Sequence, residues 1–418
     1  MKQIQNLFFK LPHTSQPVEI SLNGKNLIIT GGNGCGKTSF IKQLHYSLEK
    51  STNPEHSYEY LSKELSRLQN NIKEGASNPN YQWRKERIPQ LKKDLKELEN
   101  SKLSILDQSE FMQTYADRHF VLSYYAAERQ SDISVDDTRP SLRSLKTSES
   151  DKAMSEHFGV VFEKYLVAQK VIFNDIIATK DTQAQLQADR IEKWIYKVED
   201  DLRYLFEDNA LVLKFNREKQ SFEIHQVNKT PFQFNELSSG FSAIMYIYSD
   251  LLMKVELKDI AADKLKGIVL IDEIDAHLHV SLQRRILSFF THAFPCIQFI
   301  VTTHSPFVVQ SVDDAIIYDL SKREQLEDLS AFSYQAILEG LLGVSVNSIS
   351  TEELLDDLDD ALNIDAFNFE KVHKLTKQLA VHEVNLSPEA NLMLQAAKRQ
   401  LNLNNSDTPD KDTENERG

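Results

Sequence analysis

The chain has 418 residues, a formal net charge of −14 and two cysteines, Cys35 and Cys296. This length suits one large domain with insertions or two domains. The acidic balance argues against a surface built for sequence-independent binding of duplex DNA, which needs clustered lysine and arginine. Because Cys35 lies in a glycine-rich motif, we expect a reducing compartment rather than a structural disulfide. No apolar run approaches the roughly 20 residues that span a bilayer and no long apolar signal core begins the chain, so we expect a soluble, cytoplasmic protein.

The first predicted elements are short strands at residues 4–9, 18–22 and 27–30, and a helix follows from Ser39 to about residue 50. Between them lies the segment Gly31-Gly32-Asn33-Gly34-Cys35-Gly36-Lys37-Thr38. Strand, loop and helix around this spacing are typical of a phosphate-binding loop and argue against a chance glycine-rich turn. Glycines let successive N–H groups face phosphate oxygens, and the helix N-terminus adds partial positive charge. Lys37 can reach the β- and γ-phosphates and the Thr38 hydroxyl can ligate Mg²⁺, so the loop through Ser39 is the predicted ATP site.

Residues 57–105 are predicted to form an antiparallel helical hairpin. Leucine and isoleucine recur at heptad spacing on both sides of a turn signal at residues 75–80. Pro89 is expected to begin or kink the second arm. That arm is basic on its outside, which indicates either a solvated face balanced by neighbouring acids or a contact with a partner or nucleic acid. Its basic residues are Arg84, Lys85, Arg87, Lys92, Lys93 and Lys96.

A β-rich run at residues 120–125 precedes Gln130, which is either an ordinary surface glutamine or a sensor of the γ-phosphate or Mg²⁺. Residues 131–150 are polar and charged, and we predict a mobile loop there. Residues 152–207 again show the spacing of apolar residues that is typical of helices. Two alternating runs, 211–215 and 221–227, then predict a β-hairpin.

Two later strands end in candidate catalytic residues. Asp272 and Glu273 follow the apolar run 268–271. A carboxylate there can hold the hydration shell of Mg²⁺, and its neighbour can orient or deprotonate the attacking water. His304 follows the strand predicted at 299–303, where a neutral imidazole can hydrogen-bond a γ-phosphate.

Two further segments lie between these elements. Leu237-Ser238-Ser239-Gly240 precedes a long apolar helix, and it offers an anion site, an ordinary cap by Ser238 or Ser239, or both. Ala276-His277-Leu278-His279 contains a His-x-His pair, but no acidic or cysteine partner is placed beside it, so we do not predict a metal site there.

A last strand is predicted at 315–319, and the chain then becomes helical and acidic. The polar end of the chain, without aromatic residues, is predicted to be disordered. We therefore divide the chain as follows: 1–56, an ATPase lobe with the phosphate loop; 57–105, the hairpin insertion; 106–150, a strand, the Gln130 segment and the mobile loop; 151–230, a helical lobe and β-hairpin; 231–330, the rest of the ATPase head; 331–403, a helical acidic extension; and 404–418, the tail.

Taken together, these motifs resemble those of ABC-type ATPases of the non-transporter branch, which includes RecF, Rad50/SMC and OLD-like heads. GGNGCGKT resembles Walker A and IVLIDE resembles Walker B, with Glu273 as the catalytic glutamate. LSSG resembles the signature loop, departing from LSGGQ at Ser239 and Phe241; AHLH resembles the D-loop and VTTHSP the switch-histidine segment. The resemblance implies an α/β P-loop head, a mixed sheet flanked by helices, with a coiled-coil hairpin insertion and a helical C-terminal extension.

The sequences of the Walker B-like, D-loop-like and switch-histidine segments are most similar to those of OLD-like ATPases of bacterial anti-phage defence. OLD proteins carry a C-terminal Toprim nuclease, whose strand-borne acidic pattern is absent after His304. The chain thus resembles a stand-alone defence ATPase like that of the Septu system, whose nuclease is a separate HNH protein. This implies a head-to-tail homodimer unit, alone or within a higher homo-oligomer, with two sandwiched ATP molecules. Ser238 and Gly240 would complete the partner's site, and the nucleotide state would control a nuclease. A DNA repair ATPase that binds DNA directly and a transporter's nucleotide subunit are the alternatives.

Overall fold

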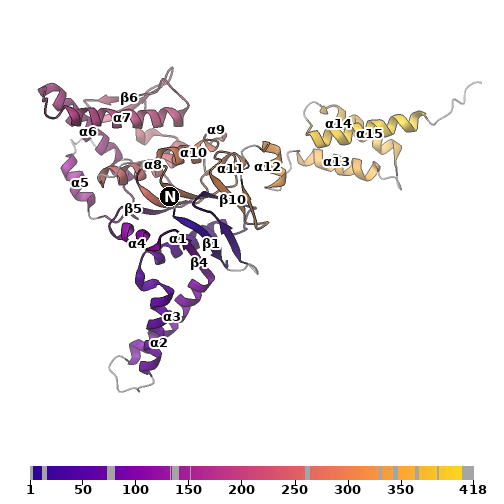
Figure 1. Ribbon diagram of the computed structural model, residues 1–418. Helices are drawn as coiled ribbons and strands as arrows, with labels where there is room; N and C mark the ends of the chain where they lie inside the picture. Colours follow the sequence, from indigo (N-terminus) through magenta and orange to yellow (C-terminus); the bar gives the residue numbers. More distant parts are fainter. Residues whose placement is uncertain are drawn as a thin grey trace, which may run out of the picture. The chain divides into compact units, whose positions relative to one another are not determined.

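The computed structural model describes residues 3–11, 17–72, 81–131, 133, 141–150, 152–258, 264–327, 329, 332–341, 347–362, 367–383 and 386–406. The chain forms two compact units, Met1–Tyr334 and Gln335–Gly418 (Figure 1). No helix among these residues is long and apolar enough to cross a membrane. Each unit has its own hydrophobic core and is described separately.

The first unit is organised around a six-stranded sheet with the order β11-β10-β3-β9-β8-β5. All neighbouring pairs are parallel except β10 and β11, which are antiparallel. The inner strands are continuous buried runs, as expected when both faces of a parallel sheet are covered. The strands are β3 (Asn26–Thr30), β5 (Phe120–Tyr125), β8 (Lys266–Ile271), β9 (Ile297–Thr302), β10 (Ala315–Asp319) and β11 (Glu324–Glu327). This architecture confirms the predicted α/β fold class, although β11 was not predicted.

A second, three-stranded antiparallel sheet has the order β2-β1-β4. Its strands are β1 (Ile4–Phe9), β2 (Val18–Ser21) and β4 (Ser101–Ile105). The prediction that residues 57–105 are entirely helical was wrong at its end, because β4 leaves the hairpin and pairs with β1, with Leu7 opposite Leu103. Phe9 of β1 packs edge-on against Phe40 of α1 (Lys37–Ser51), with ring centroids 5.4 Å apart. The small sheet therefore shares a core with the helix that begins at the phosphate loop.

The predicted coiled-coil hairpin is confirmed as α2 (Tyr58–Ile72) and α3 (Tyr81–Asn100). Leu61 and Leu68 of α2 pack with Leu91 and Leu95 of α3 in a separate apolar cluster. Helix α3 begins before Pro89 and contains it, so the arm does not begin at Pro89, and the alternative of a kink there stays a prediction. The turn signal at residues 75–80 lies outside the described residues.

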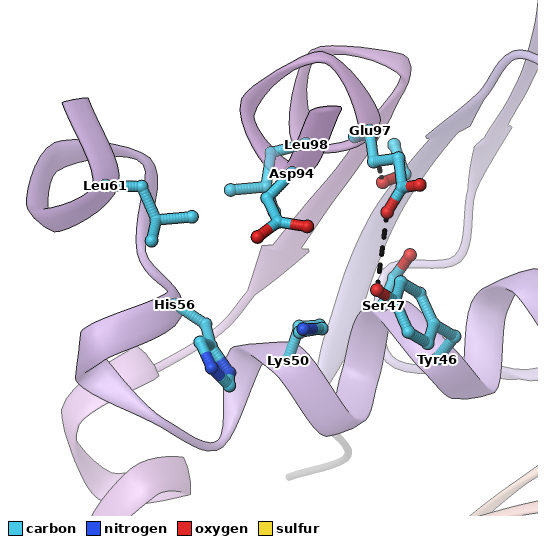
Figure 2. Close-up of a pocket in the computed structure, with 9 residues that line it drawn as sticks. Tyr46, Ser47, Lys50, His56, Leu61, Asp94, Glu97 and Leu98 are labelled. Carbon is cyan, nitrogen blue, oxygen red and sulfur yellow. Dashed lines mark hydrogen bonds between the residues drawn. The ribbon is translucent and has the colours of Figure 1, made fainter. Parts of the chain in front are cut away.

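The base of the hairpin contacts the far end of α1. Tyr46 of α1 donates a hydrogen bond from its hydroxyl to Glu97 Oε2 of α3, at 3.3 Å (Figure 2). A small cavity of about 20 Å³ lies there, enough for about one water-sized probe. Its lining includes Lys50, His56, Leu61, Asp94 and Leu98. One helix thus joins the phosphate loop at its N-terminus to the hairpin at its C-terminus.

A mainly helical lobe covers residues 142–257 of the first unit. Its elements are α5 (Leu142–Ser150), α6 (Phe162–Thr179), α7 (Gln185–Phe206), β6 (Val212–Asn216), β7 (Ser221–His225) and α8 (Ser239–Leu257). Helix α5 contradicts the prediction of a mobile loop over residues 142–150, because Leu145 and Glu149, one helical turn apart, are both buried on one face of the helix. The rest of that predicted loop, apart from residues 131, 133 and 141, lies outside the described residues.

A buried ion pair fixes the helical lobe to the large sheet. Lys254 and Asp250, one turn apart on α8, lie 2.7 Å apart with side chains 1% exposed. The Lys254 ammonium also donates to Ser123 Oγ of β5 at 2.9 Å. Asp250 accepts hydrogen bonds from the Tyr125 hydroxyl of β5 and, at 2.6 Å, from the Phe158 N–H. Burial and the Asp250 charge hold the pKa of Tyr125 well above 10. Strand β5 and helix α8 are therefore joined by polar contacts inside the core.

The second unit contains α13 (Ile349–Leu362), α14 (Phe369–Ala380) and α15 (Pro388–Ser406), and α12 (Tyr334–Gly340) lies at the boundary between the units. Leu358, Val372 and Leu394, one from each long helix, are fully buried in its core. The predicted helical C-terminal extension is thus confirmed. The tail predicted from residue 404 begins inside α15, and residues 407–418 lie outside the described part.

Candidate nucleotide-binding site

The glycine-rich loop joins the carboxyl end of β3 to α1. Gly31, Gly34 and Gly36 have φ angles of 135°, 76° and 99°, which residues with a Cβ rarely adopt. A Cβ on Gly31 would also lie 2.9 Å from Cys35 Sγ and from Ser321 Oγ. The Ser321 hydroxyl accepts a hydrogen bond from the Gly32 N–H at 2.8 Å. The segment after β10 therefore supports the loop from the side.

Lys37, the first residue of α1, lies within this loop and is 6% exposed. Its ammonium donates to the carbonyl oxygens of Gly31 at 2.9 Å and Gly32 at 3.0 Å. These carbonyls hold the cation at the mouth of the loop, where an anion would compete for it. Around it Asn33, Thr38 and Ser39 are exposed, so their polar groups are open to a ligand.

Asp272 and Glu273 follow β8, and β9 fixes both of them. Thr302, the last residue of β9, donates from Oγ1 to Asp272 Oδ1 at 2.7 Å and accepts from the Glu273 N–H at 2.7 Å. The Asp272 N–H donates to the Tyr125 carbonyl of β5 at 2.8 Å. Asp272 is 2% exposed, whereas Glu273 is half-buried and has a φ angle of 47°. Glu273 thus stands in a left-handed turn at the edge of the sheet.

The charges of other candidate residues act on His304. His304 is half-buried after β9, and burial and then the Lys37 charge lower the pKa of its imidazole, against the opposing charges of Asp275 and Glu273. The imidazole is therefore neutral at pH 7. Near the same edge, burial and then the Asp272 charge raise the pKa of Tyr124 to about 12, so its phenol stays neutral as well.

Hydrogen bonds join the switch-histidine segment to the residues after Glu273. The Thr303 hydroxyl donates to the Asp275 carboxylate and accepts from the Ser305 N–H at 2.9 Å. The Ser305 hydroxyl donates to Gln283 Oε1 at 2.7 Å, at the end of α9 (Val280–Gln283). His279 caps α9, since its Nδ1 accepts from the Ser281 N–H at 3.4 Å. The part of the chain that the structure describes contains no group of three or more His, Cys, Asp or Glu residues able to hold a metal ion.

The signature-like loop precedes α8. Ser238 occupies the N-cap position, but its exposed side chain makes no capping hydrogen bond, so the ordinary-cap interpretation was wrong for that side chain. A Cβ on Gly240 would lie 2.9 Å from the His277 carbonyl oxygen, which explains a glycine at this close approach. Phe241 stacks on Phe206 of α7, with ring centroids 4.0 Å apart. The departure from the familiar signature motif at Phe241 therefore serves the packing of the lobe.

Gln130 is exposed and lies beside this chain's own signature-like loop. It lines an open hollow of about 470 Å³ with Leu237, Ser239 and His277. The neighbouring Ser131 N–H donates to Ser242 Oγ of α8 at 2.9 Å. The segment after β5 is thus held against the start of α8.

Sequence reasoning did not single out several residues that shape this edge of the sheet. Thr302 and Thr303 lie within VTTHSP, so the motif contained a signal for them. Asp275 lies two residues after Glu273, the last of the Walker B-like residues. Ser321 and Arg129 had no such signal. The guanidinium of Arg129 donates to the carbonyl oxygens of Asp272 at 2.9 Å and of Glu273 at 3.0 Å.

More than half of the chain matches a described family model, and shorter stretches match curated proteins. A family model described as "AAA domain, putative AbiEii toxin, Type IV TA system" matches residues 58–310. Septu protein PtuA of Bacillus thuringiensis is 33% identical over 127 residues, which are 27% of this chain and 32% of that protein. PtuA of Bacillus mycoides (strain KBAB4) is 39% identical over 95 residues, 23% of this chain and 13% of that protein. The "Retron Ec83 probable ATPase" of Escherichia coli is 33% identical over 138 residues, 32% of this chain and 25% of that protein. The chain therefore matches less than a third of the length of each of these relatives.

Among solved structures, the chain is similar to the Smc head bound to the C-terminal winged-helix domain of ScpA. The TM-score is 0.37 at 13% identity, with 79% of this chain and 100% of that chain covered. The SMC head domain of Thermotoga maritima gives a TM-score of 0.34 at 12% identity, with 78% and 97% covered. The fold assignment rests on the strand order and the phosphate loop described above.

Proposed function

The chain belongs to the AAA-domain family whose model spans residues 58–310, and from this premise we propose that it binds ATP with Mg²⁺ and hydrolyses it to ADP and phosphate. One observation carries the proposal. The neighbouring parallel strands β3, β9 and β8 end at one edge of the sheet, and they are followed by the glycine-rich loop, by His304 and by Asp272-Glu273. Ligands of open α/β sheets bind at the carboxyl ends of the strands.

In this proposal the loop from Gly31 to Ser39 binds the triphosphate. Its left-handed glycines turn N–H groups toward phosphate oxygens, and the N-terminus of α1 adds positive potential. Lys37 exchanges the Gly31 and Gly32 carbonyls for the β- and γ-phosphates. That exchange replaces neutral partners of the ammonium with charged ones, which bind it more strongly.

The proposed Mg²⁺ ligands are the Thr38 hydroxyl and, directly or through water, the Asp272 carboxylate. This pair fits the metal, because Mg²⁺ in nucleotide sites takes one or two protein oxygens plus phosphates instead of an all-protein cage. Asp272 is 2% exposed and held by Thr302 at 2.7 Å, so its carboxylate is fixed before any ligand arrives. When bound, the ion would neutralise charge on the β- and γ-phosphates.

Glu273 is the proposed general base that orients and deprotonates the attacking water. His304 is the proposed γ-phosphate contact, and its lowered pKa keeps it a neutral hydrogen-bonding group at pH 7. Gln130 is proposed to sense the γ-phosphate or Mg²⁺ from the segment after β5. Catalysis of this kind depends on positioning and on charge, without a covalent intermediate.

We also propose that two copies assemble head to tail around two ATP molecules. Ser238 and Gly240 of one subunit would then complete the site of the other. Ser238 supports this, because its exposed hydroxyl makes no capping bond and stands at the start of a 19-residue helix. Hydrolysis would separate the subunits and so change a surface that another protein recognises.

The output we propose is control of a separate nuclease, of HNH type, in anti-phage defence. The similarity to PtuA and to retron ATPases supports a role in defence. Direct binding of DNA is the second candidate, because α3 exposes Lys85, Lys92 and Lys96 and also carries Trp83, which is 57% exposed. Co-purification of a nuclease encoded by a neighbouring gene would favour the first candidate. Salt-dependent DNA binding that a Lys85→Glu, Lys92→Glu, Lys96→Glu variant loses would favour the second.

Titration with a fluorescent ATP analogue tests the proposed nucleotide site. We expect Lys37→Ala to lose binding while its circular dichroism spectrum stays that of the wild type. Lys42→Ala, an exposed lysine on the same helix, is the matched control and should bind normally. A folded Lys37→Ala variant with wild-type affinity would refute the assignment of the loop.

A further inference from the structure

Arg129 lies just after β5, and its guanidinium faces the turn that follows β8. It donates to five main-chain carbonyl oxygens, two from its own segment and three from the other. The first two are those of Ala126 at 2.8 Å and Ala127 at 3.4 Å. The other three are those of Asp272 at 2.9 Å, Glu273 at 3.0 Å and Ile274 at 3.1 Å. Burial lowers the pKa of Arg129 to about 10 against the opposing charges of Asp275, Asp272 and Glu273, so the side chain remains a cation at pH 7.

The turn after β8 needs such a partner. The N–H groups of Asp272, Glu273 and Ile274 donate to Tyr125 O, Thr302 Oγ1 and Thr302 O. The carbonyl oxygens of Asp272, Glu273 and Ile274 all accept hydrogen bonds from Arg129, and that of Glu273 also accepts one from the Ala276 N–H at 2.9 Å. Without the guanidinium, these carbonyl oxygens would lose a charged donor beside the carboxylates of Asp272 and Glu273. A planar guanidinium offers a fork of donors that can serve several acceptors at once.

Glu273 is the residue in this turn with a left-handed backbone, at a φ angle of 47°. A residue with a Cβ keeps such a conformation only when the surrounding contacts determine it. Two of those contacts are now identified: Thr302 on the N–H side and Arg129 on the carbonyl side. The direction of the Glu273 side chain follows from this backbone conformation.

We propose that Arg129 is a positioning residue for hydrolysis, which holds the turn Asp272–Ile274 so that the Glu273 carboxylate faces the attacking water. The inference rests on the proposed ATPase activity and deepens it. The hydrogen bonds of Arg129 to the turn all go to main-chain carbonyl oxygens, and none of its five described hydrogen bonds goes to the phosphate loop. Its loss should therefore act on the catalytic step and spare the binding of nucleotide.

The first test compares Arg129→Ala with the wild type in the full chain. We expect kcat to fall about 10²-fold, as for a catalytic group displaced by about an ångström, while Kd for a fluorescent ATP analogue and KM change little. Arg129→Lys keeps the charge but lacks the fork, so its kcat should also stay well below that of the wild type. Arg190→Ala, at an exposed position of α7, is the matched control and should leave kcat unchanged.

Two further measurements separate positioning from a general loss of structure. Millimolar guanidinium chloride, far below denaturing concentrations, should restore part of the activity of Arg129→Ala. The added guanidinium ion can occupy the space left by the arginine side chain and donate to the same carbonyl oxygens. It should not restore Lys37→Ala. The double variant Arg129→Ala, Glu273→Gln should turn over no more slowly than Glu273→Gln alone, because Arg129 acts through Glu273.

The outcomes distinguish this inference from the proposed function. Turnover by Arg129→Ala at the wild-type rate, with Glu273→Gln inactive, would overturn the role of Arg129 and leave the ATPase assignment intact. Loss of nucleotide binding in both Arg129→Ala and Arg129→Lys would overturn it too. A wild-type chain that binds ATP analogues but releases no phosphate would instead refute the proposed ATPase activity.

Discussion

Replacing Lys254 with methionine should destabilise the first unit strongly. Met has a similar volume, but Asp250 is left without its cation at a position where both side chains are 1% exposed. Breaking a buried ion pair on one side costs about 3–5 kcal/mol. Residues 1–334 form the unit, so an unfolding entropy of about 2.1 cal/mol/K per residue gives about 0.7 kcal/mol/K for the whole unit. The melting temperature should therefore fall by about 4–7 °C.

Differential scanning calorimetry of the full chain measures this shift, and two variants calibrate it. Lys197→Met removes a partly exposed ion pair with Asp201, at 3.5 Å, and should cost at most about 1 kcal/mol. The double variant Lys254→Met, Asp250→Asn removes the uncompensated charge and should recover most of the loss. A single variant that melts within a degree of the wild type, or a double variant no better than the single, would refute the reasoning.

Two other predictions test a buried acid and the proposed dimer. Glu163 of α6 is 2% exposed, and burial raises its pKa from 4.5 to about 7. Because the folded state then binds this proton more tightly than the unfolded state, stability should fall as the pH rises from 5 toward 8, by up to about 3 kcal/mol. Glu163→Gln should remove that slope in urea denaturation at the two pH values; an unchanged slope would exclude Glu163 as its source. Ser238→Arg should spare ATP binding within one subunit but abolish ATP-dependent assembly, measured by light scattering. Normal assembly would show that residues 237–240 only begin a helix and do not complete the partner's site.

The sequence predicts the parts of this site whose residues lie close together along the chain. The glycine-rich loop carries its own spacing, and its strand and helix follow from the apolar pattern around it. Asp272 and His304 were predicted because each follows a buried apolar run, and the structure shows that the strands of those runs are parallel and end at the same edge of the sheet. The catalytic roles of these residues remain predictions.

Features that depend on distant pairing were not predictable in the same way. Strand β4 follows α3 directly, and only its partner β1, almost a hundred positions earlier, makes it a strand. Strand β11 has the sequence Glu-Gln-Leu-Glu at the sheet edge, so it lacks an apolar pattern. Arg129 donates to carbonyl oxygens more than 140 residues away, and main-chain acceptors leave no signal in the sequence. An arginine beside Gln130 is therefore interpreted as a surface residue until the fold is known.

The most direct test of the proposed ATPase is steady-state phosphate release by Glu273→Gln beside the wild type, with Mg²⁺ and ATP. Removing a positioned general base should slow turnover about 10²–10⁴-fold, while the affinity for a fluorescent ATP analogue stays that of the wild type. The variant should then accumulate as the ATP-bound dimer. Turnover of Glu273→Gln at the wild-type rate would contradict the assignment of this edge of the sheet as the catalytic site.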